Sequence, residues 1–240
     1  METSSSYFME GPVKPQLLRF GDSQSPIVVI DEFSGDVENV VRIAEALAPF
    51  PEIDVNYYPG VRRLITRSDA HADAYVEGTC RDAGQFIAGA FDVDSFTFVE
   101  ASFSIVSLRP DQLHPLQRAP HFDSADQKYY ALLHYLRVPP DTGTAFYRQR
   151  STGIERITEE NLAQFVGAAK AAAAQLPPNS GYIQGSDVFY EQIGMVEAIP
   201  DRMVIYQGSL LHSGIIPPDM PLSADPREGR LTANIFVRGH

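Results

Sequence analysis

The chain has 240 residues, of which 44% are hydrophobic and 10% aromatic, enough to bury the core of one large domain. Its formal net charge of -12 argues against nucleic acid as the main partner, because phosphate binding needs a basic surface. No apolar run approaches about 18 residues, and the polar N-terminal segment lacks a signal-peptide core, so neither a membrane span nor export is expected. The single cysteine, Cys80, excludes an intramolecular disulfide, and these features together predict a cytoplasmic protein.

The first part of the chain, to about residue 94, predicts a mainly helical layer. Apolar residues recur at helical spacing in two stretches, and a β-branched run precedes the first of them. In chain order the patterns predict an irregular lead-in (1–26), a strand (26–33), a helix (about 36–48), a turn-bearing loop (56–64) and a second helix (69–91).

From about residue 95 the pattern changes to strands separated by glycine and proline. One amphipathic helix, 158–174, interrupts them, and Thr158 is its predicted N-cap. This spacing predicts a mainly β (α+β) fold, a sandwich or jelly roll with the helices packed outside. We expect one domain over 1–240, with the helical layer over about 1–94 and the β core over about 95–240. The predicted strands are 95–108, 128–138, 143–150, 202–216 (with a turn at Gly208) and 230–238.

A histidine and an aspartate stand one residue apart in the stretch APHFDS, as His121 and Asp123. In extended backbone both side chains point to the same face, which suits two ligands of one metal ion. The motif alone is weak, because His71 and Asp73 repeat it. That second pair lies in a predicted helix, where residues i and i+2 do not share a face, so we interpret it as solvated surface.

His212, in the strand-like stretch SLLHSG, completes the candidate metal site. Two histidines and one carboxylate form the arrangement that leaves coordination positions open on non-haem Fe(II), and zinc accepts the same ligand types. Arg230 opens the last predicted strand and can bind a carboxylate through both arms of its guanidinium. Thr232 would face the same way and add a hydroxyl donor. His134, inside a strand, is expected to be a packed or hydrogen-bonded histidine.

Three stretches together resemble one enzyme family. They read RPDQLHPLQRAPHFD, LLHYLRVPPDTGTAF and LLHSGIIP…GRLTANIFVR, and they cover about residues 104–237. In this order they are similar to the Fe(II)/2-oxoglutarate-dependent dioxygenases, with prolyl hydroxylases as the nearest type. The chain also resembles an uncharacterised bacterial family within that superfamily.

The resemblance implies a double-stranded β-helix (jelly roll) and an oxygenase that uses Fe(II), 2-oxoglutarate and dioxygen to hydroxylate a C–H bond. The substrate would be a small molecule, an amino acid or a peptide. By resemblance His121, Asp123 and His212 are the metal ligands and catalytic centre, and Arg230 and Thr232 bind 2-oxoglutarate. The family's early-strand tyrosine is missing from the matching stretch SIVSL, so Tyr135 or Tyr130 is expected to replace it. Arg148, after GTAFY, is a candidate substrate-binding residue, with a surface role as the alternative.

Two other functions remain open from the sequence. A non-catalytic jelly roll would keep the fold and the metal as a binding module. A zinc hydrolase would need a general base near the metal, and no clear candidate stands out in the sequence.

Overall fold

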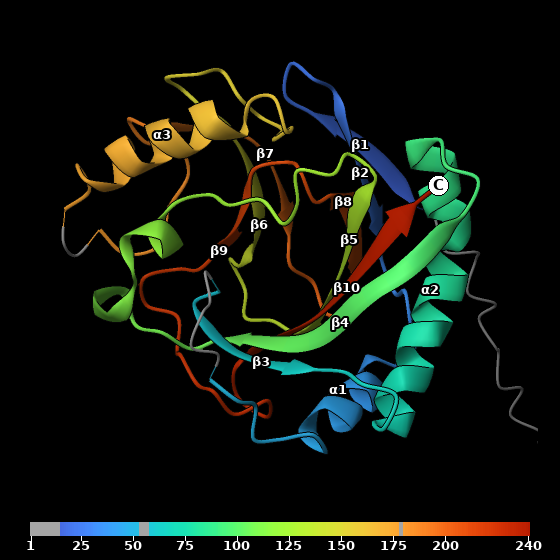
Figure 1. Ribbon diagram of the computed structural model, residues 1–240. Helices are drawn as coiled ribbons and strands as arrows, with labels where there is room; N and C mark the ends of the chain where they lie inside the picture. Colours follow the sequence, from blue (N-terminus) through green and yellow to red (C-terminus); the bar gives the residue numbers. More distant parts are fainter. Residues whose placement is uncertain (1–14, 53–57, 178–179) are drawn as a thin grey trace, which may run out of the picture.

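Two antiparallel β-sheets face each other, with helices over their outer surfaces (Figure 1). The computed structural model describes residues 15–52, 58–177 and 180–240. The larger sheet has seven strands in the order β1-β2-β8-β5-β10-β4-β3, and the smaller has three in the order β7-β6-β9. The strands of the larger sheet are β1 (Gln16–Phe20), β2 (Ser25–Ile30), β3 (Gly60–Leu64), β4 (Phe96–Val106), β5 (Tyr129–Arg137), β8 (Met203–Gln207) and β10 (Arg230–Gly239). Those of the smaller sheet are β6 (Gly143–Gln149), β7 (Tyr190–Glu197) and β9 (His212–Ile215).

Strand β10 lies inside the larger sheet, between β4 and β5, and its two faces differ in chemistry. Because side chains alternate along a strand, its odd-numbered residues face the helices and its even-numbered residues face the smaller sheet. The outward set is apolar: Leu231, Ala233, Ile235 and Val237. The inward set is mostly polar and lines a cavity: Arg230, Thr232, Asn234 and Phe236.

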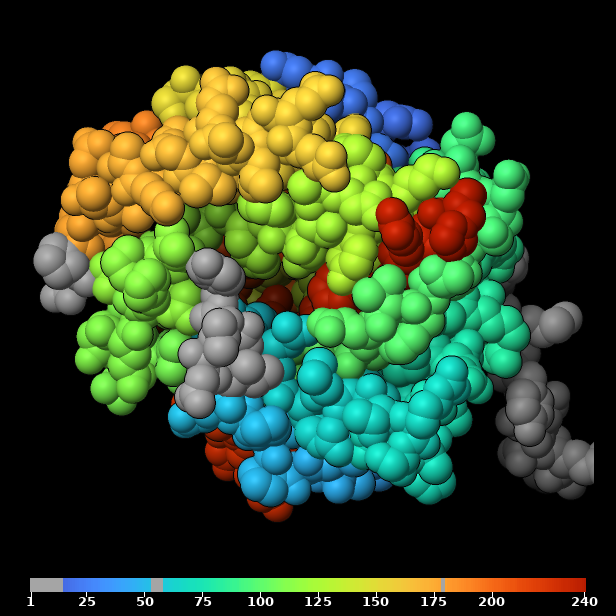
Figure 2. Space-filling view, in the orientation of Figure 1, coloured from blue at the N-terminus to red at the C-terminus, as the bar shows by residue number. Residues whose placement is uncertain are grey.

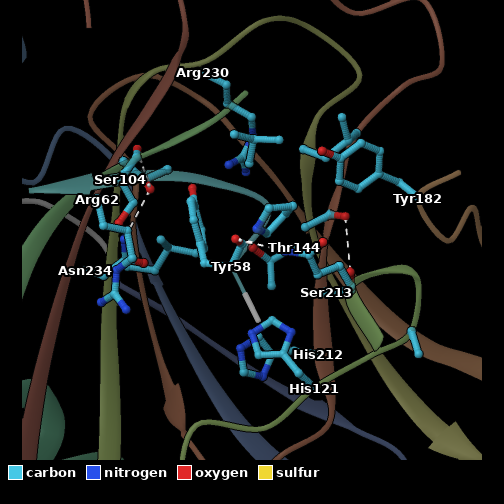
Figure 3. Close-up of a pocket in the computed structure, with 18 of the residues that line it drawn as sticks. Tyr58, Arg62, Ser104, His121, Thr144, Tyr182, His212, Ser213, Arg230 and Asn234 are labelled. Atoms are coloured by element: carbon cyan, nitrogen blue, oxygen red, sulfur yellow. Dashed lines mark hydrogen bonds between the residues drawn. The ribbon is translucent and has the colours of Figure 1, made fainter. Parts of the chain in front are cut away.

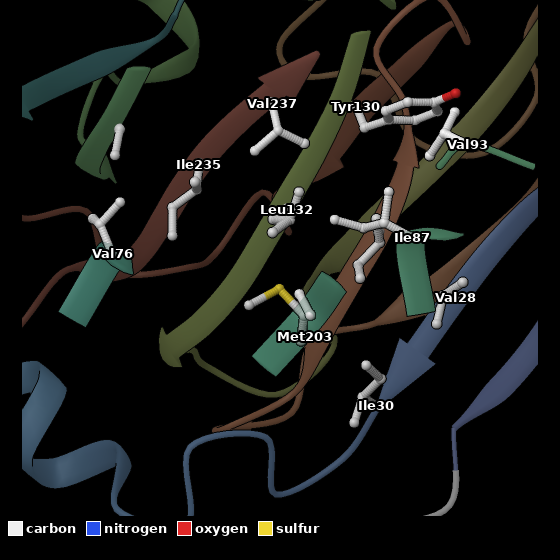
Figure 4. Packing of buried hydrophobic residues seen from close by; sticks show 13 residues of the cluster. Val28, Ile30, Val76, Ile87, Val93, Tyr130, Leu132, Met203, Ile235 and Val237 are labelled. Atoms are coloured by element: carbon white, nitrogen blue, oxygen red, sulfur yellow. The ribbon is translucent and has the colours of Figure 1, made fainter. Parts of the chain in front are cut away.

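Helices α1 (Val37–Glu45) and α2 (Ala70–Phe91) cover the outer face of the larger sheet, whereas α3 (Leu162–Ala173) covers the smaller one (Figure 1). In Figure 4, Ile87 of α2 packs among side chains of the sheet that include Leu132 and Ile235, all of them fully buried. Each such side chain contributes about 1.5–3 kcal/mol through burial. None of the helices in the described part of the chain is both long and apolar enough to cross a bilayer.

The structure agrees with most of the predicted elements and corrects four. The first is the predicted loop over 56–64, which contains strand β3 in its described part. Its two arginines do not favour a strand in the sequence, but pairing with β4 stabilises it as an edge strand. The second is β1, a strand within the predicted lead-in, so the N-terminal region contributes strands as well as helices. The third is strand β7, which the sequence analysis missed because its charged residues interrupt the apolar pattern of a strand. The fourth is α3, which begins at Leu162, because Thr158 and Asn161 hydrogen-bond each other in the preceding turn.

A buried polar network joins α2 to the larger sheet. His134 is fully buried and lies between the Tyr75 hydroxyl and the Asp201 carboxylate, 2.8 Å from each. Asp201 also accepts hydrogen bonds from the backbone and hydroxyl of Ser34 and from the backbone of Gly35. His134 is therefore a hydrogen-bonded strand histidine, as expected, and the network fixes the chain before α1.

Asp201→Asn should lower the free energy of unfolding by about 2 kcal/mol at pH 7, because a carboxylate accepting several hydrogen bonds is lost. Burial alone would raise the pKa of Asp201, but hydrogen bonds from His134 and Ser34 outweigh it and hold that pKa below its usual value. The wild-type advantage is therefore complete above the unfolded pKa of about 4 and disappears as pH falls through the lower folded value. Urea unfolding between pH 2 and pH 7 measures the difference, with the exposed Asp94→Asn as control.

Candidate metal centre and cavity

His121 and His212 are joined through their backbones. The amide of each donates to the carbonyl of the other, at 2.9 and 2.8 Å, which makes an isolated antiparallel bridge. Their rings consequently lie on the same side, with centroids 4.3 Å apart. Residues far apart in the sequence are thereby brought into one site, with His212 at the start of β9.

Asp123 is held beside this pair by the turn between β8 and β9. Its amide donates to the Gly208 carbonyl at 2.7 Å. A Cβ atom at position 208 would lie 2.8 Å from the Tyr129 ring and 3.2 Å from the Asp123 Cβ, so glycine permits this close approach. One ligand atom each from His121, Asp123 and His212 lies within 4.8 Å of the other two. The convergence expected from the sequence is what the structure shows.

The chemistry of these three side chains fits a metal ion. The Oδ2 atom of Asp123 is buried without a hydrogen-bond partner and lies 3.7 Å from Nε2 of His212. Nδ1 of His212 lies 2.8 Å from the Leu210 carbonyl and donates to it, which leaves Nε2 with a free lone pair directed at the site. An unpartnered buried carboxylate oxygen is costly in a folded protein, and a bound cation would satisfy it.

The protonation states also suit metal binding. Burial lowers the pKa of His212 to about 4. His121 lines the cavity and is exposed there, but desolvation by the surrounding protein, with the nearby His212, lowers its pKa to about 4 as well. Burial raises the pKa of Asp123 to about 6, although His121 opposes the shift. At neutral pH the site therefore presents two neutral imidazoles and one carboxylate, which are the forms that bind metals.

The triad opens into a cavity of about 190 Å³ between the two sheets. Figure 2 shows the molecular surface hollowed between β3 and the segment that carries His121, with atoms of the C-terminal strands at its base. In Figure 3 Arg230 lies at one end of the cavity and the two histidines at the other. Arg62 and Asn234 lie on one side, opposite Tyr182.

Arg230 and Thr232 both line this cavity. Arg230 is 4% exposed; its Nη2 donates to the Gly143 carbonyl at 3.2 Å, and its Nε is buried without a partner. Thr232 lies next to it on the same face of β10, at 3.5 Å from the Ser104 carbonyl. The structure therefore brings both predicted cosubstrate residues into one cavity with the metal centre.

Tyr135 and Arg148 are placed differently. Tyr135 is fully buried, its hydroxyl donates to Thr144 at 2.7 Å, and its ring lies 5.7 Å from the Arg230 guanidinium, so it backs the cavity without lining it. Tyr130, the other candidate, points to the helix side of the sheet. Arg148 lies at the far end of β6, where it is paired with the carboxylates of Asp22, Glu155 and Glu191. The structure does not bring Arg148 to the cavity.

Several cavity residues escaped the sequence analysis. Asn234 could have been found, because it follows Arg230 and Thr232 at strand spacing on β10. Tyr58 and Arg62 could not, since only the tertiary pairing of β3 with β4 brings them there. Burial raises the pKa of Tyr58 to about 12. Its hydroxyl is buried in the cavity without a hydrogen-bond partner.

The sequence matches the profile of the Family of unknown function (DUF6445) over residues 12–237. The chain belongs to this family. No curated protein sequence matches it significantly.

Several solved structures resemble the fold. The chain is similar to SnoN, a non-heme alpha ketoglutarate dependent epimerase from nogalamycin biosynthesis, at a TM-score of 0.52 and 11% identity over 90% of this chain and 80% of SnoN. HygX from Streptomyces hygroscopicus with nickel and 2-oxoglutarate bound matches at 0.49 and 14%, over 90% and 84%. A Pseudomonas putida prolyl-4-hydroxylase matches at 0.47 and 13%, over 90% and 94%. The predicted mainly β jelly roll with outer helices is confirmed.

Asp123→Asn should abolish metal binding and at the same time stabilise the metal-free protein. The folded-state pKa of Asp123 is raised to about 6, so the wild type loses stability as pH rises from the unfolded pKa of about 4 to the folded value, and the loss is complete above it. Removing that charge should raise the free energy of unfolding at pH 8 by roughly 2 kcal/mol, with little gain at pH 3. Calorimetric titration with Ni(II) and urea unfolding without metal measure the two effects.

Asp126→Asn is the matched control, because this carboxylate lies three positions later and pairs with Arg238 instead. It should bind Ni(II) as the wild type does. Wild-type affinity in Asp123→Asn, or a loss of stability at pH 8, would contradict the assignment.

Proposed function

We propose that the protein is an Fe(II)/2-oxoglutarate-dependent oxygenase that hydroxylates a C–H bond of a small molecule, an amino acid or a peptide. The observation that carries this proposal is the convergence of His121, Asp123 and His212 on one point at the end of a cavity that also contains a buried arginine. The jelly-roll fold is consistent with it.

In this proposal the three ligands hold iron through Nε2 of His212, the His121 ring and Asp123 Oδ2. Bound iron, with 2-oxoglutarate and dioxygen, supplies the oxidising chemistry. Three protein ligands leave the remaining coordination positions to the cosubstrates. The Asp123 carboxylate also favours hydroxylation over halogenation, by the family resemblance.

Arg230 is the proposed partner of the distal carboxylate of 2-oxoglutarate. It lies across the cavity from the metal ligands, and its Nε is left free to donate (Figure 3). Thr232 adds a hydroxyl beside it. We assign Tyr135 a positioning role here, because its ring packs against the guanidinium while its own hydroxyl is bonded to Thr144.

The two alternatives receive less support. A zinc hydrolase would use a carboxylate base in the cavity, and the described lining residues include no carboxylate. A non-catalytic metal module would leave the buried Arg230 without a ligand. A cytoplasmic setting is part of the proposal. Cys80 is consistent with it as a free, unreactive thiol, because burial raises the pKa of Cys80 to about 11.

The test is anaerobic addition of Fe(II) and then 2-oxoglutarate to the metal-free protein. A weak visible charge-transfer band should appear only when both are present, and admission of air should release succinate. A protein that binds Fe(II) but gives neither signal would be the non-catalytic module. Hydrolysis of test esters with Zn(II), and no succinate with Fe(II), would indicate the hydrolase.

Arg230→Lys keeps the positive charge but loses the two-armed fork, so the apparent affinity for 2-oxoglutarate should fall more than about tenfold, or about 1.4 kcal/mol. Titration of the charge-transfer band measures it. Arg227→Lys is the control, because Arg227 is exposed in the preceding loop and pairs with Asp225. If Arg230→Lys keeps wild-type affinity, the cosubstrate carboxylate is bound elsewhere.

A further inference from the structure

The cavity contains a second arginine that the proposed cosubstrate does not use. Arg62, on β3, lines the same cavity, and its side chain is only 18% exposed. Its guanidinium lies over the Tyr58 ring, 5.9 Å from the centroid. Nε and Nη2 donate to the Ser102 hydroxyl at 3.3 and 2.9 Å, which orients the fork and leaves Nη1 without a partner in the described part of the chain.

The register of the larger sheet places this guanidinium beside Asn234. Arg62 pairs across with Ser104, but its side chain reaches along β4 to Ser102, and Ser102 pairs with Asn234 of β10. Figure 3 shows Arg62 and Asn234 together on one wall, apart from Arg230 and facing the opposite wall at Tyr182. The two arginines therefore serve different parts of the cavity.

The charges at the site point to an additional anion. Iron(II) and Arg230 are balanced by Asp123 and the two carboxylates of 2-oxoglutarate, in formal charge. Arg62 then leaves one positive charge in excess. The described lining residues provide no carboxylate to neutralise it. Glu100 touches Arg62 at 3.4 Å from outside the cavity, but its side chain is 46% exposed, and exposed ion pairs of this kind are weak.

We propose that Arg62 binds an anionic group of the oxygenated substrate, a carboxylate or a phosphate monoester, and that Asn234 donates a further hydrogen bond to it. Arginine presents a planar fork that matches either group. Asn234 Nδ2 is already directed along this wall, 3.3 Å from the Thr232 hydroxyl. The inference rests on the proposed function, because it assumes that the molecule in the cavity is the substrate of an oxygenase. It adds that this substrate carries an acidic group.

The experiment compares an acid with its neutral analogue. Benzoate, phenyl phosphate and benzamide are titrated calorimetrically into protein saturated with Ni(II) and 2-oxoglutarate, so that the metal and Arg230 are occupied. Benzamide has the shape of benzoate without the charge. We expect one of the two anions to bind at least about tenfold more tightly than benzamide, and the stronger one identifies the group as carboxylate or phosphate.

Arg62→Gln should abolish the preference for the anion over benzamide. Arg63→Gln is the matched control: its side chain follows on the same strand, points to the opposite face and pairs with Asp69. It should keep the preference. A purely structural role for Arg62 would lower the melting temperature without changing the discrimination between benzoate and benzamide, so thermal unfolding of both variants is measured alongside.

Equal affinity of the wild type for the anions and benzamide, no binding of any anion, or the same loss in both variants would overturn the inference. Failure of 2-oxoglutarate to bind the nickel protein would refute the proposed function alone. In that case the same titrations without cosubstrate still compare Arg62→Gln with Arg63→Gln, and the anion site stands or falls on that difference.

Discussion

The reciprocal backbone hydrogen bonds between His121 and His212 are the constraint on which the site depends. They do not belong to a long ladder, and they join a segment that follows a short 3-10 turn to the first residue of β9. A main-chain bridge fixes the spacing of the two Cα atoms, so the imidazoles meet before any metal arrives. The amide of Asp123 donates to the carbonyl of Gly208, which lies at the start of the turn between β8 and β9; His212 follows the end of that turn. The backbone hydrogen bonds therefore fix the positions of the three candidate metal ligands before a metal binds.

Polar atoms without partners gather around the cavity. The described residues include five buried side-chain atoms of this kind, and three belong to Asp123, Arg230 and Tyr58. Such atoms are rare in folded proteins because each costs free energy. A bound metal ion and an anionic ligand, as in the proposed function, would satisfy these atoms. The outer faces of the same strands are apolar and pack on α1 and α2, and this burial offsets the free energy that the unpartnered atoms cost.

The sequence predicted the features that depend on local pattern. Strand β10 could be foreseen from its alternation, and the histidines and aspartate from their spacing and family resemblance. Arg62 could not, because nothing within GVRRL distinguishes a cavity arginine from a surface one; Arg63, beside it, has the same local sequence and faces away. Arg148 was a candidate substrate residue, with a surface role as the alternative, for the converse reason. Its strand position was right, but it pairs with three carboxylates, and two of them, Asp22 and Glu191, are distant in the sequence.

Arg62 and Arg230 differ in how firmly the sheet holds them. Strand β10 is hydrogen-bonded along both sides, to β4 and β5, and Arg230, its first residue, pairs with Val106 of β4. Strand β3 lies at the edge and has a ladder only with β4 in the described chain, apart from one bridge between Val61 and Glu52. An edge strand tolerates insertion, bulging and exchange of side chains far better than an interior one. In the proposed oxygenase the scaffold thus separates an interior strand that holds the cosubstrate arginine from an edge strand that holds the substrate arginine, so changes in β3 could alter the substrate without disturbing the metal ligands.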